Sequence, residues 1–153
     1  MEWSDVISNP LLQNLPFKIE LNKWGKILMS PASNLHGRIQ GYITANVLSK
    51  IPSGEVITEC SIHTSDGVKV ADIAWLSDEF IAEYQYTTPY PKAPEICVEI
   101  VFPSNSKIEI QEKVELYLSK GAIEVWVVYD LKSIEYYTHT GLIEVSKFFS
   151  SQS

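Results

Sequence analysis

The sequence predicts an α/β fold of the α+β kind, in which helices pack against a mixed β-sheet. Apolar residues recur at three- and four-residue steps over 33–51, which is typical of an amphipathic helix. An Asp-Gly pair at 66–67 separates two β-branched runs, which is typical of a β-hairpin. The segment 96–129 has the pattern strand, helix, strand, which should form a right-handed parallel crossover. The sheet should therefore contain parallel and antiparallel pairs.

The N-terminal part predicts an arm followed by a hairpin. Residues 1–16 contain Pro10 and Pro16 and show weak periodicity, so we expect an extended or loosely packed arm. Apolar and polar residues then alternate in "FKIELNKWGKILMSP" on both sides of a turn at 23–25. This alternation predicts a first hairpin that ends at Pro31.

The next segment predicts a long amphipathic helix. Ser33 is a suitable N-cap residue, and Pro52 and Gly54 mark the end of the helix. The expected apolar stripe consists of Leu35, Ile39, Tyr42, Ile43, Val47 and Ile51.

The middle of the chain predicts an antiparallel strand pair and a long connection. The runs "EVITECSIHT" and "VKVADIAWLS" flank the Asp-Gly turn and should pair with each other. A short helical piece follows, and then prolines at 89, 91 and 94 that preclude regular structure. A connection of this kind, over 84–95, is often functional.

The C-terminal part predicts a buried strand, a helix and three further strands. "ICVEIVF" is almost entirely apolar, as in a strand covered on both faces. Ser104 or Ser106 can cap the helix that follows, and Gly121 ends it. "EVWVVYD" is a second apolar strand, and two short strands flank a Thr140-Gly141 turn. The helix stripe is Ile110, Val114, Tyr117 and Leu118, and residues 148–153 should form a frayed tail.

Length and composition favour one compact domain over residues 1–153. No stretch approaches the roughly 18 to 20 apolar residues of a membrane span, and the N-terminus lacks a signal-peptide pattern, so we expect a cytoplasmic protein without membrane contact. Cys60 and Cys97 lie in apolar runs without metal-ligand spacing and should be reduced and buried. The net charge of −7 argues against a protein whose main task is to coat nucleic acid through a broad basic surface, but it permits local contact with a phosphate backbone.

Two carboxylates interrupt apolar strands. Asp72 lies in "VADIAWL" and Glu99 lies in "ICVEIVF". A buried carboxylate is costly unless it is paired, hydrogen-bonded or bound to a metal. Two of them on adjacent strands can converge on one Mg²⁺ ion, which typically takes one or two carboxylates and keeps several waters or phosphate oxygens.

Lys113 is the third residue of this hypothesis. At about 100° per residue it falls at the edge of the apolar stripe of its helix, from where its ammonium can reach a polar pocket at the sheet edge. Asp, Glu and Lys around a cation suit phosphodiester hydrolysis, because the metal activates water while the lysine orients it or stabilises negative charge.

The same residues also allow a purely structural interpretation. Asp72 would then pair with a lysine on a neighbouring strand, Glu99 would cap a local network, and Lys113 would be a solvated helix residue. His36 has two interpretations as well, since it can contact a phosphate or a water near the site, or it can be an ordinary hydrogen-bonded residue.

Taken in order, these motifs resemble a known family. "EICVEIVFPSNSKIEIQEKVELYLSKGAIEVWVVYD" is similar to the signature of the putative restriction endonuclease family of the Uma-two type, a branch of the PD-(D/E)XK nuclease superfamily. The matching positions are Pro94, Glu99, Pro103-Ser104, Lys113, Tyr117, Gly121 and Trp126.

The resemblance extends upstream, over roughly residues 19–137 in all. "VADIAWLS" resembles the segment that carries the family's acidic residue, here Asp72. "MSPASNLHGRIQGYI" resembles its first helix, with His36 at the usual histidine position. Three positions depart from the pattern: Ala71 replaces a proline, Val70 replaces an arginine, and Phe102-Pro103 replaces Leu-Ser-Pro.

The resemblance implies a restriction-endonuclease-like core of αβββαβ type, extended by the N-terminal hairpin and the C-terminal strands. It implies a Mg²⁺ or Mn²⁺ site made by Asp72 and Glu99. In the wider superfamily a lysine follows two places after the acidic residue, where this chain has Val101. The resemblance to this branch implies that Lys113 takes over as the catalytic base.

The leading hypothesis is therefore a Mg²⁺-dependent endonuclease that hydrolyses DNA phosphodiester bonds, acting as a homodimer. The alternative is a catalytically inactive nuclease-fold protein that serves as a dimeric interaction or regulatory module. The acidic composition, Ala71 and Val101 favour the alternative. The joint presence of Asp72, Glu99 and Lys113 favours the enzyme.

Overall fold

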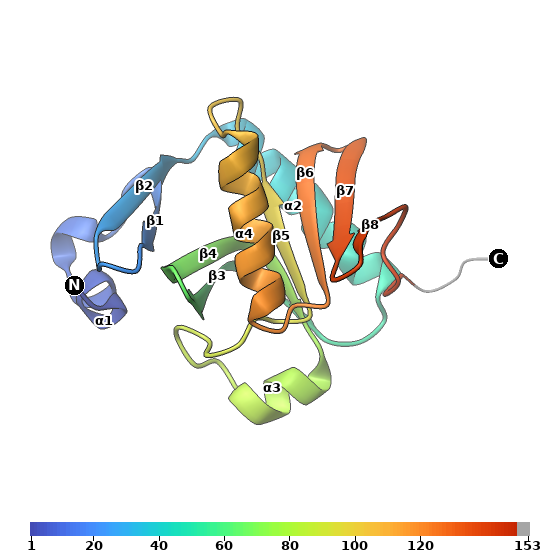
Figure 1. The fold of residues 1–153 in the computed structure, drawn as a ribbon, viewed down its shortest axis with the longest axis horizontal. Helices are drawn as coiled ribbons and strands as arrows, with labels where there is room; N and C mark the ends of the chain where they lie inside the picture. Colours follow the sequence, from blue (N-terminus) through green and yellow to red (C-terminus); the bar gives the residue numbers. More distant parts are fainter. Residues whose placement is uncertain (150–153) are drawn as a thin grey trace.

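The computed structural model describes residues 1–149 and contains a six-stranded sheet with the order β3-β4-β5-β6-β7-β8 and a separate two-stranded sheet, β1-β2 (Figure 1). The strands are β1 (Phe17–Leu21), β2 (Ile27–Pro31), β3 (Glu55–Thr64), β4 (Gly67–Leu76), β5 (Ile96–Ile100), β6 (Glu124–Asp130), β7 (Ser133–Thr138) and β8 (Gly141–Ile143). The helices are α1 (Trp3–Ser8), the 3-10 turn η1 (Pro10–Leu12), α2 (Asn34–Lys50), α3 (Asp78–Tyr84) and α4 (Lys107–Ser119).

The sheet is mixed, as the sequence predicts. β5 and β6 are parallel and are connected through α4, while the other neighbouring pairs are antiparallel. The expected order αβββαβ is confirmed by α2, β3, β4, β5, α4 and β6, with α3 inserted between β4 and β5.

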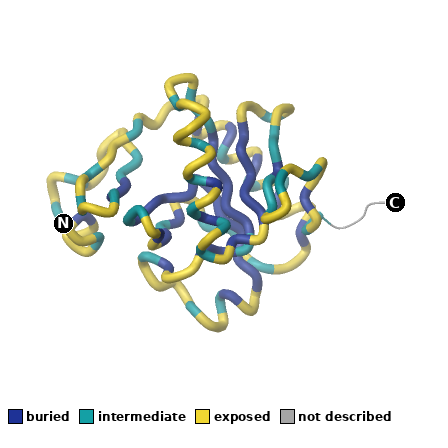
Figure 2. Tube along the Cα trace, viewed as in Figure 1, coloured by how far each residue is buried: buried dark blue, intermediate teal, exposed yellow. Residues whose placement is uncertain are grey.

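Helices α2 and α4 cover opposite faces of the sheet, and the most deeply buried chain lies between them (Figures 1 and 2). On one face, Ile39, Ile43 and Val47 of α2 pack against residues such as Ile96 and Val98 of β5. On the other face, Val114 and Tyr117 of α4 pack in a cluster with Cys60 and Cys97. The central strands are therefore apolar on both sides, which explains their unbroken apolar sequences.

The apolar stripe of α2 differs from the expected one. Leu35 and Tyr42 are 64% and 59% exposed. At about 100° per residue around the helix axis, Leu35 and Tyr42 project roughly 100° away from the direction in which Ile43 projects. His36 and Gln40 project closer to the direction of Ile43. Two polar residues thus take places on the face of α2 that packs on the sheet.

The N-terminal arm corrects our expectation of extended structure. Residues 1–16 contain the helix α1 and the turn η1, because Glu2 and Asp5 form a capping box and Asn9 caps the turn. Val6 is buried in a small cluster with Leu21 of β1 and Val68 of β4. The arm therefore contributes to holding the β1-β2 hairpin on the sheet.

The C-terminal end also differs in part. Phe148 packs against Trp75, and Phe149 packs against Trp126, so these two residues are not frayed. The rest of the expected tail, 150–153, lies outside the described residues. Cys60 and Cys97 are free and buried, as predicted. No helix in residues 1–149 is long and apolar enough to cross a membrane.

Candidate functional site

The candidate site lies where β4 and β5 separate. The two strands pair only from Ile73 to Trp75 of β4. Beyond Ile73, the Oδ2 atom of Asp72 accepts a hydrogen bond of 2.7 Å from the main-chain nitrogen of Ile100, so a side chain bridges the strands. The fork that results leaves main-chain groups of β4 without a partner strand, and it places Asp72 and Glu99 inside the gap.

The β1-β2 hairpin supplies the missing partners. The Oε2 atom of Glu20 accepts a hydrogen bond of 2.7 Å from the Val70 nitrogen, and the Nζ atom of Lys18 donates to the Val70 oxygen at 2.9 Å. Because side chains alternate along a strand, Lys18 and Glu20 project from the same face of β1. Both main-chain groups of Val70 are thus satisfied by the hairpin.

Lys113 enters the gap from α4. Its Nζ atom donates to Glu99 Oε1 at 2.7 Å and to Glu20 at 2.9 Å. Ser106 caps α4 and fixes where the helix begins, so Lys113 lies almost two turns inside it. The expectation that this lysine reaches a polar pocket is confirmed, and its side chain is 19% exposed.

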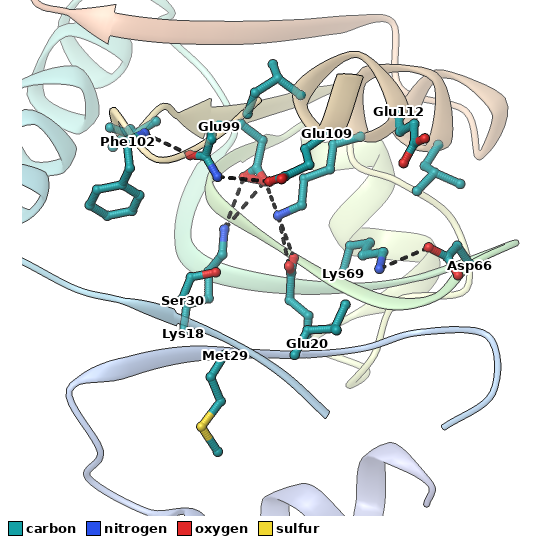
Figure 3. A pocket seen from close by; sticks show the side chains of 16 residues that line it. Lys18, Glu20, Met29, Ser30, Asp66, Lys69, Glu99, Phe102, Glu109 and Glu112 are labelled. Atoms are coloured by element: carbon teal, nitrogen blue, oxygen red, sulfur yellow. Dashed lines mark hydrogen bonds and ion pairs between the residues drawn. The ribbon is translucent and has the colours of Figure 1, made fainter. Parts of the chain in front are cut away.

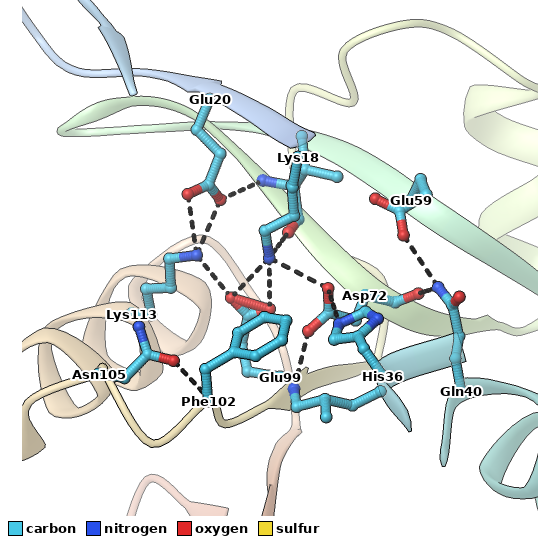
Figure 4. Close-up of polar contacts among 12 residues, drawn as sticks. Lys18, Glu20, His36, Gln40, Glu59, Asp72, Glu99, Phe102, Asn105 and Lys113 are labelled. Carbon is cyan, nitrogen blue, oxygen red and sulfur yellow. Dashed lines mark hydrogen bonds and ion pairs between the residues drawn. The ribbon is translucent and has the colours of Figure 1, made fainter. Parts of the chain in front are cut away.

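Lys18 lies between the two carboxylates that the sequence analysis selects (Figure 4). Its Nζ atom is 3.1 Å from Asp72 Oδ1 and 3.4 Å from both carboxylate oxygens of Glu99. The carboxylates of Asp72 and Glu99 therefore converge on one point, because the same ammonium contacts oxygens of both. Both residues are almost completely buried, at 1% and 2% exposure.

His36 is joined to the site through Asp72. Its Nε2 atom lies 3.2 Å from Asp72 Oδ1, and its ring stacks on Phe102 with a centroid distance of 5.0 Å and an angle of 8°. The hydrogen bond to Asp72 raises the pKa of His36, against the opposing effect of burial. His36 therefore holds and shields one side of the Asp72 carboxylate.

Gln40, one turn further along α2, forms a hydrogen bond to the main chain of Asp72. Its Nε2 atom donates to the Asp72 main-chain oxygen at 2.7 Å and to Glu59 Oε1 at 2.9 Å. Glu59 stands opposite Asp72 on β3 and has a left-handed φ of 54°, and the pairing of β3 with β4 is interrupted there. Backbone strain of this kind often occurs beside functional sites.

The pKa values of Asp72 and Glu99 are shifted in opposite directions. Burial opposes the charge on Asp72, but Lys18, His36 and the Ile100 nitrogen outweigh it and lower the pKa of Asp72 to about 2. At Glu99 burial dominates and raises the pKa, although Lys113 and Lys18 oppose this shift. Perturbed pKa values of this kind occur at functional sites and also in structural ion-pair networks.

A cavity of about 330 Å³ opens beside these groups (Figure 3). The hairpin β1-β2 forms one wall and α4 forms the other. The lining residues include Lys18, Glu20, Met29, Glu99, Phe102 and Lys113. A cavity of this volume lies at the lower end of the range for small-molecule sites. It gives Glu99 access to the surface, whereas Asp72 lies behind Lys18 and does not line it.

Asp72, Glu99 and Lys113, which the sequence predicts as site residues, lie together in the structure. Lys18 and Glu20 are not among the predicted site residues, although "FKIEL" places both on one face of an alternating strand. Nothing in that pattern shows which other element the face will meet. In the purely structural interpretation, Asp72 pairs with a lysine of a strand, and the ion pair with Lys18 of β1 confirms this. The same interpretation is wrong about Lys113, which is not a solvated helix residue.

The donor atoms fit a hard divalent cation. The ammonium of Lys18 is surrounded by oxygens of Asp72, Glu99 and the Val70 main chain, which are the ligand types that Mg²⁺ and Mn²⁺ prefer. In residues 1–149, no three His, Cys, Asp or Glu side chains are grouped to hold a metal ion by themselves. Asp72 and Glu99 would hold the ion together with water or substrate oxygens.

Comparison with solved structures supports the fold. The chain is similar to the crystal structure of a putative nuclease of the family DUF820 from Anabaena variabilis, with a TM-score of 0.64 and 19% sequence identity. The match covers 86% of this chain and 83% of the other. No curated protein matches the chain.

Comparison with protein families covers nearly the whole chain. The model of the family Uma2, described as "Putative restriction endonuclease", matches residues 9–149. This range includes the hairpin residues and every residue of the site described above. The chain therefore belongs to the putative restriction endonuclease family Uma2.

Proposed function

We propose that this protein is a metal-dependent endonuclease that hydrolyses DNA phosphodiester bonds. The observation that carries the proposal is the convergence of Asp72, Glu99 and Lys113 on one gap beside a cavity that reaches the surface. Family membership supports a nuclease, and DNA is the substrate that a restriction endonuclease family suggests.

Asp72 and Glu99 would bind Mg²⁺ or Mn²⁺. When bound, the cation polarises the phosphate and lowers the pKa of a coordinated water. His36 and the Ile100 nitrogen fix the Asp72 carboxylate, so that its remaining lone pairs face the gap. Burial of both carboxylates strengthens their interaction with a cation, because the local dielectric is low.

Lys113 stands beside Glu99, on the cavity side. Its ammonium donates to Glu99 and Glu20 at the same time. To act as the catalytic base it would first have to give up a proton and these contacts. The geometry gives more support to its other proposed role, in which it orients the attacking water or stabilises charge on the phosphate oxygens.

The alternative function is a catalytically inactive nuclease-fold protein that serves as a dimeric interaction or regulatory module. The position of Lys18 favours it, because two ion pairs already satisfy Asp72 and Glu99 without a metal. A buried network of this kind can be purely structural. A homodimer is part of the proposal as well, because dimer formation is expected of nucleases that cut both strands. The alternative function is also that of a dimer.

Nicking of supercoiled plasmid tests the proposal. The wild type, Asp72→Asn and Glu99→Gln are compared in Mg²⁺, in Mn²⁺ and in EDTA, with Glu83→Gln as the matched control. Glu83 is exposed on α3, away from the cavity. We expect nicking by the wild type and by Glu83→Gln with either metal and none in EDTA, and a loss of at least about a hundredfold in the two site variants.

The outcome separates the two functions. Nicking that is equal in all four proteins would come from a contaminating nuclease and would contradict the assignment of the site. Absence of nicking by the folded wild type on supercoiled, linear and single-stranded DNA would favour the non-catalytic alternative.

A further inference from the structure

Lys18 occupies the position that a metal ion between Asp72 and Glu99 would need. Its Nζ atom contacts Asp72 Oδ1 at 3.1 Å, Glu99 at 3.4 Å and the Val70 oxygen at 2.9 Å. A Mg²⁺ or Mn²⁺ ion binds such oxygens at roughly 2.0 to 2.6 Å. Because the same lone pairs would face the ion and the ammonium, the two cations exclude each other.

We propose that Lys18 is a built-in counter-cation of the site, which holds Asp72 and Glu99 together and is displaced when a divalent cation binds. This inference rests on the proposed function, because it requires that these two carboxylates bind a metal. Lys18 then competes with the metal for the two carboxylates and lowers the fraction of molecules that have a metal ion bound.

The charge balance favours an exchange over simultaneous occupancy. Three carboxylates, of Glu20, Asp72 and Glu99, face the ammonium groups of Lys18 and Lys113. If His36, which contacts Asp72 Oδ1 at 3.2 Å, is counted as a neutral imidazole, a divalent cation in place of Lys18 would balance the three negative charges together with Lys113. A divalent cation in addition to Lys18 would leave an excess positive charge in a buried place, which is unfavourable.

The structure also gives Lys18 room to leave. Its side chain is 13% exposed and lines the cavity between the hairpin and α4, so the ammonium can turn toward solvent or toward a substrate phosphate there. The main chain of Lys18 can stay in place, since it pairs with Ser30 of β2. Only the flexible four-carbon stem has to change its conformation.

The consequence is a reduced apparent affinity for metal. A ligand that binds only the fraction of molecules with an open site has its dissociation constant raised by the inverse of that fraction. Removal of the Lys18 ammonium should therefore tighten metal binding, although it removes two ion pairs from the metal-free protein. A purely structural lysine would have the opposite effect, because its loss would loosen the two ligands.

Calorimetric titration with Mn²⁺ distinguishes these cases. The full chain is titrated as wild type, as Lys18→Met, as Lys18→Arg, which keeps the positive charge, and as Lys92→Met. Lys92 is exposed in the loop before β5 and serves as the control for loss of one surface charge. We expect Lys18→Met to bind Mn²⁺ about tenfold more tightly than the wild type. Lys92→Met should match the wild type, and Lys18→Arg should bind no more tightly than it.

Each result has a separate meaning. If the wild type binds Mn²⁺ and the folded Lys18→Met variant binds it equally or more weakly, the exchange is wrong while the proposed metal site stands. If no protein in the set binds Mn²⁺ at millimolar concentration, the proposed function fails, and the exchange fails with it.

A second measurement uses the wild type alone and does not depend on the stability of a variant. The side-chain ¹⁵Nζ resonances of lysine are recorded by NMR during titration with Mg²⁺. Displacement predicts a large change for the Lys18 signal, which the Lys18→Arg spectrum assigns. An unchanged Lys18 signal at saturating Mg²⁺ would overturn the proposal.

Discussion

At the scale of single residues, the site is a set of charges that are buried only because each has a partner. Lys18 and Lys113 pair with Glu20, Asp72 and Glu99, and His36 completes the set. Burial opposes the charged form of Lys18, but Glu99, Asp72 and Glu20 outweigh it and raise its pKa. Loss of one partner therefore affects the others strongly.

Glu20 provides the first test at this scale. Glu20→Ala leaves Lys113 with one carboxylate and removes the acceptor of the Val70 nitrogen. We expect a loss of roughly 3 to 5 kcal/mol in the free energy of unfolding, measured with urea. Glu115→Ala, at an exposed position on α4 outside the cavity, should change it by less than about 0.5 kcal/mol. Equal effects of the two substitutions would show that the buried network is not formed.

His36 predicts a pH dependence. The folded protein raises the pKa of His36 above its usual 6.5, so the protonated imidazole stabilises the fold. This contribution is fully present below pH 6.5 and is lost as the pH rises through the folded-state pKa. In metal-free buffer, the difference in Tm between the wild type and His36→Gln should be larger at about pH 6 than at about pH 9. A difference that grows toward high pH would contradict the contact with Asp72.

At the scale of elements, the β1-β2 hairpin completes the site. Its side chains satisfy the main chain of β4 where β5 no longer pairs, and its cluster with Val6 and Val68 holds it there. The main chain of the hairpin passes close to Gly67, where an added Cβ would lie 2.4 Å from the main-chain oxygens of Leu21 and Asn22.

Gly67→Ala should therefore push the hairpin away from β4. Gly67 also has a φ of +77°, so the substitution combines a steric clash with backbone strain. Gly141 is a matched control, since its φ is +109° but an added Cβ would meet nothing within 4 Å. We expect Gly141→Ala to cost about 1 to 2 kcal/mol of unfolding free energy and Gly67→Ala to cost clearly more. Only Gly67→Ala should also reduce nicking; equal losses in both variants would contradict the role of the hairpin.

Elements were more predictable from the sequence than the contacts between them. The turn at Asp66-Gly67, the cap at Ser33 and the apolar strands predict local structure, because their signals are local. The fork between β4 and β5 depends on where pairing stops, which no local signal specifies. The role of Lys18 and Glu20 depends on the docking of a separate hairpin. In the arm, the local caps at Glu2 and Asn9 were overlooked, and only its packing on Leu21 and Val68 is long-range.

At the scale of the whole molecule, the acidic net charge limits how DNA can be bound. A net charge of −7 opposes approach of a polyanion. The cavity does not offset it by itself, because its lining carries five carboxylates and three lysines. Single-domain organisation over 1–153, the homodimer and a cytoplasmic location stay predictions from the sequence.

This charge predicts that DNA binding depends on the metal. By fluorescence anisotropy at about 50 mM salt, we expect weak binding of an oligonucleotide in EDTA and tighter binding in Ca²⁺, which can neutralise the carboxylates. Higher salt should weaken both. Binding that is tight in EDTA and unchanged by the cation would show that DNA contacts a surface other than this site.

The central claim is that Asp72 and Glu99 form a metal site. A crystal soaked in Mn²⁺ tests it most directly, because anomalous scattering locates the ion without assumptions about ligands. We predict a peak between the two carboxylates, within roughly 2.0 to 2.6 Å of an oxygen of each, with the Lys18 ammonium turned into the cavity. A map from a fully soaked crystal with no peak there, and with Lys18 still bridging Asp72 and Glu99, would contradict the account.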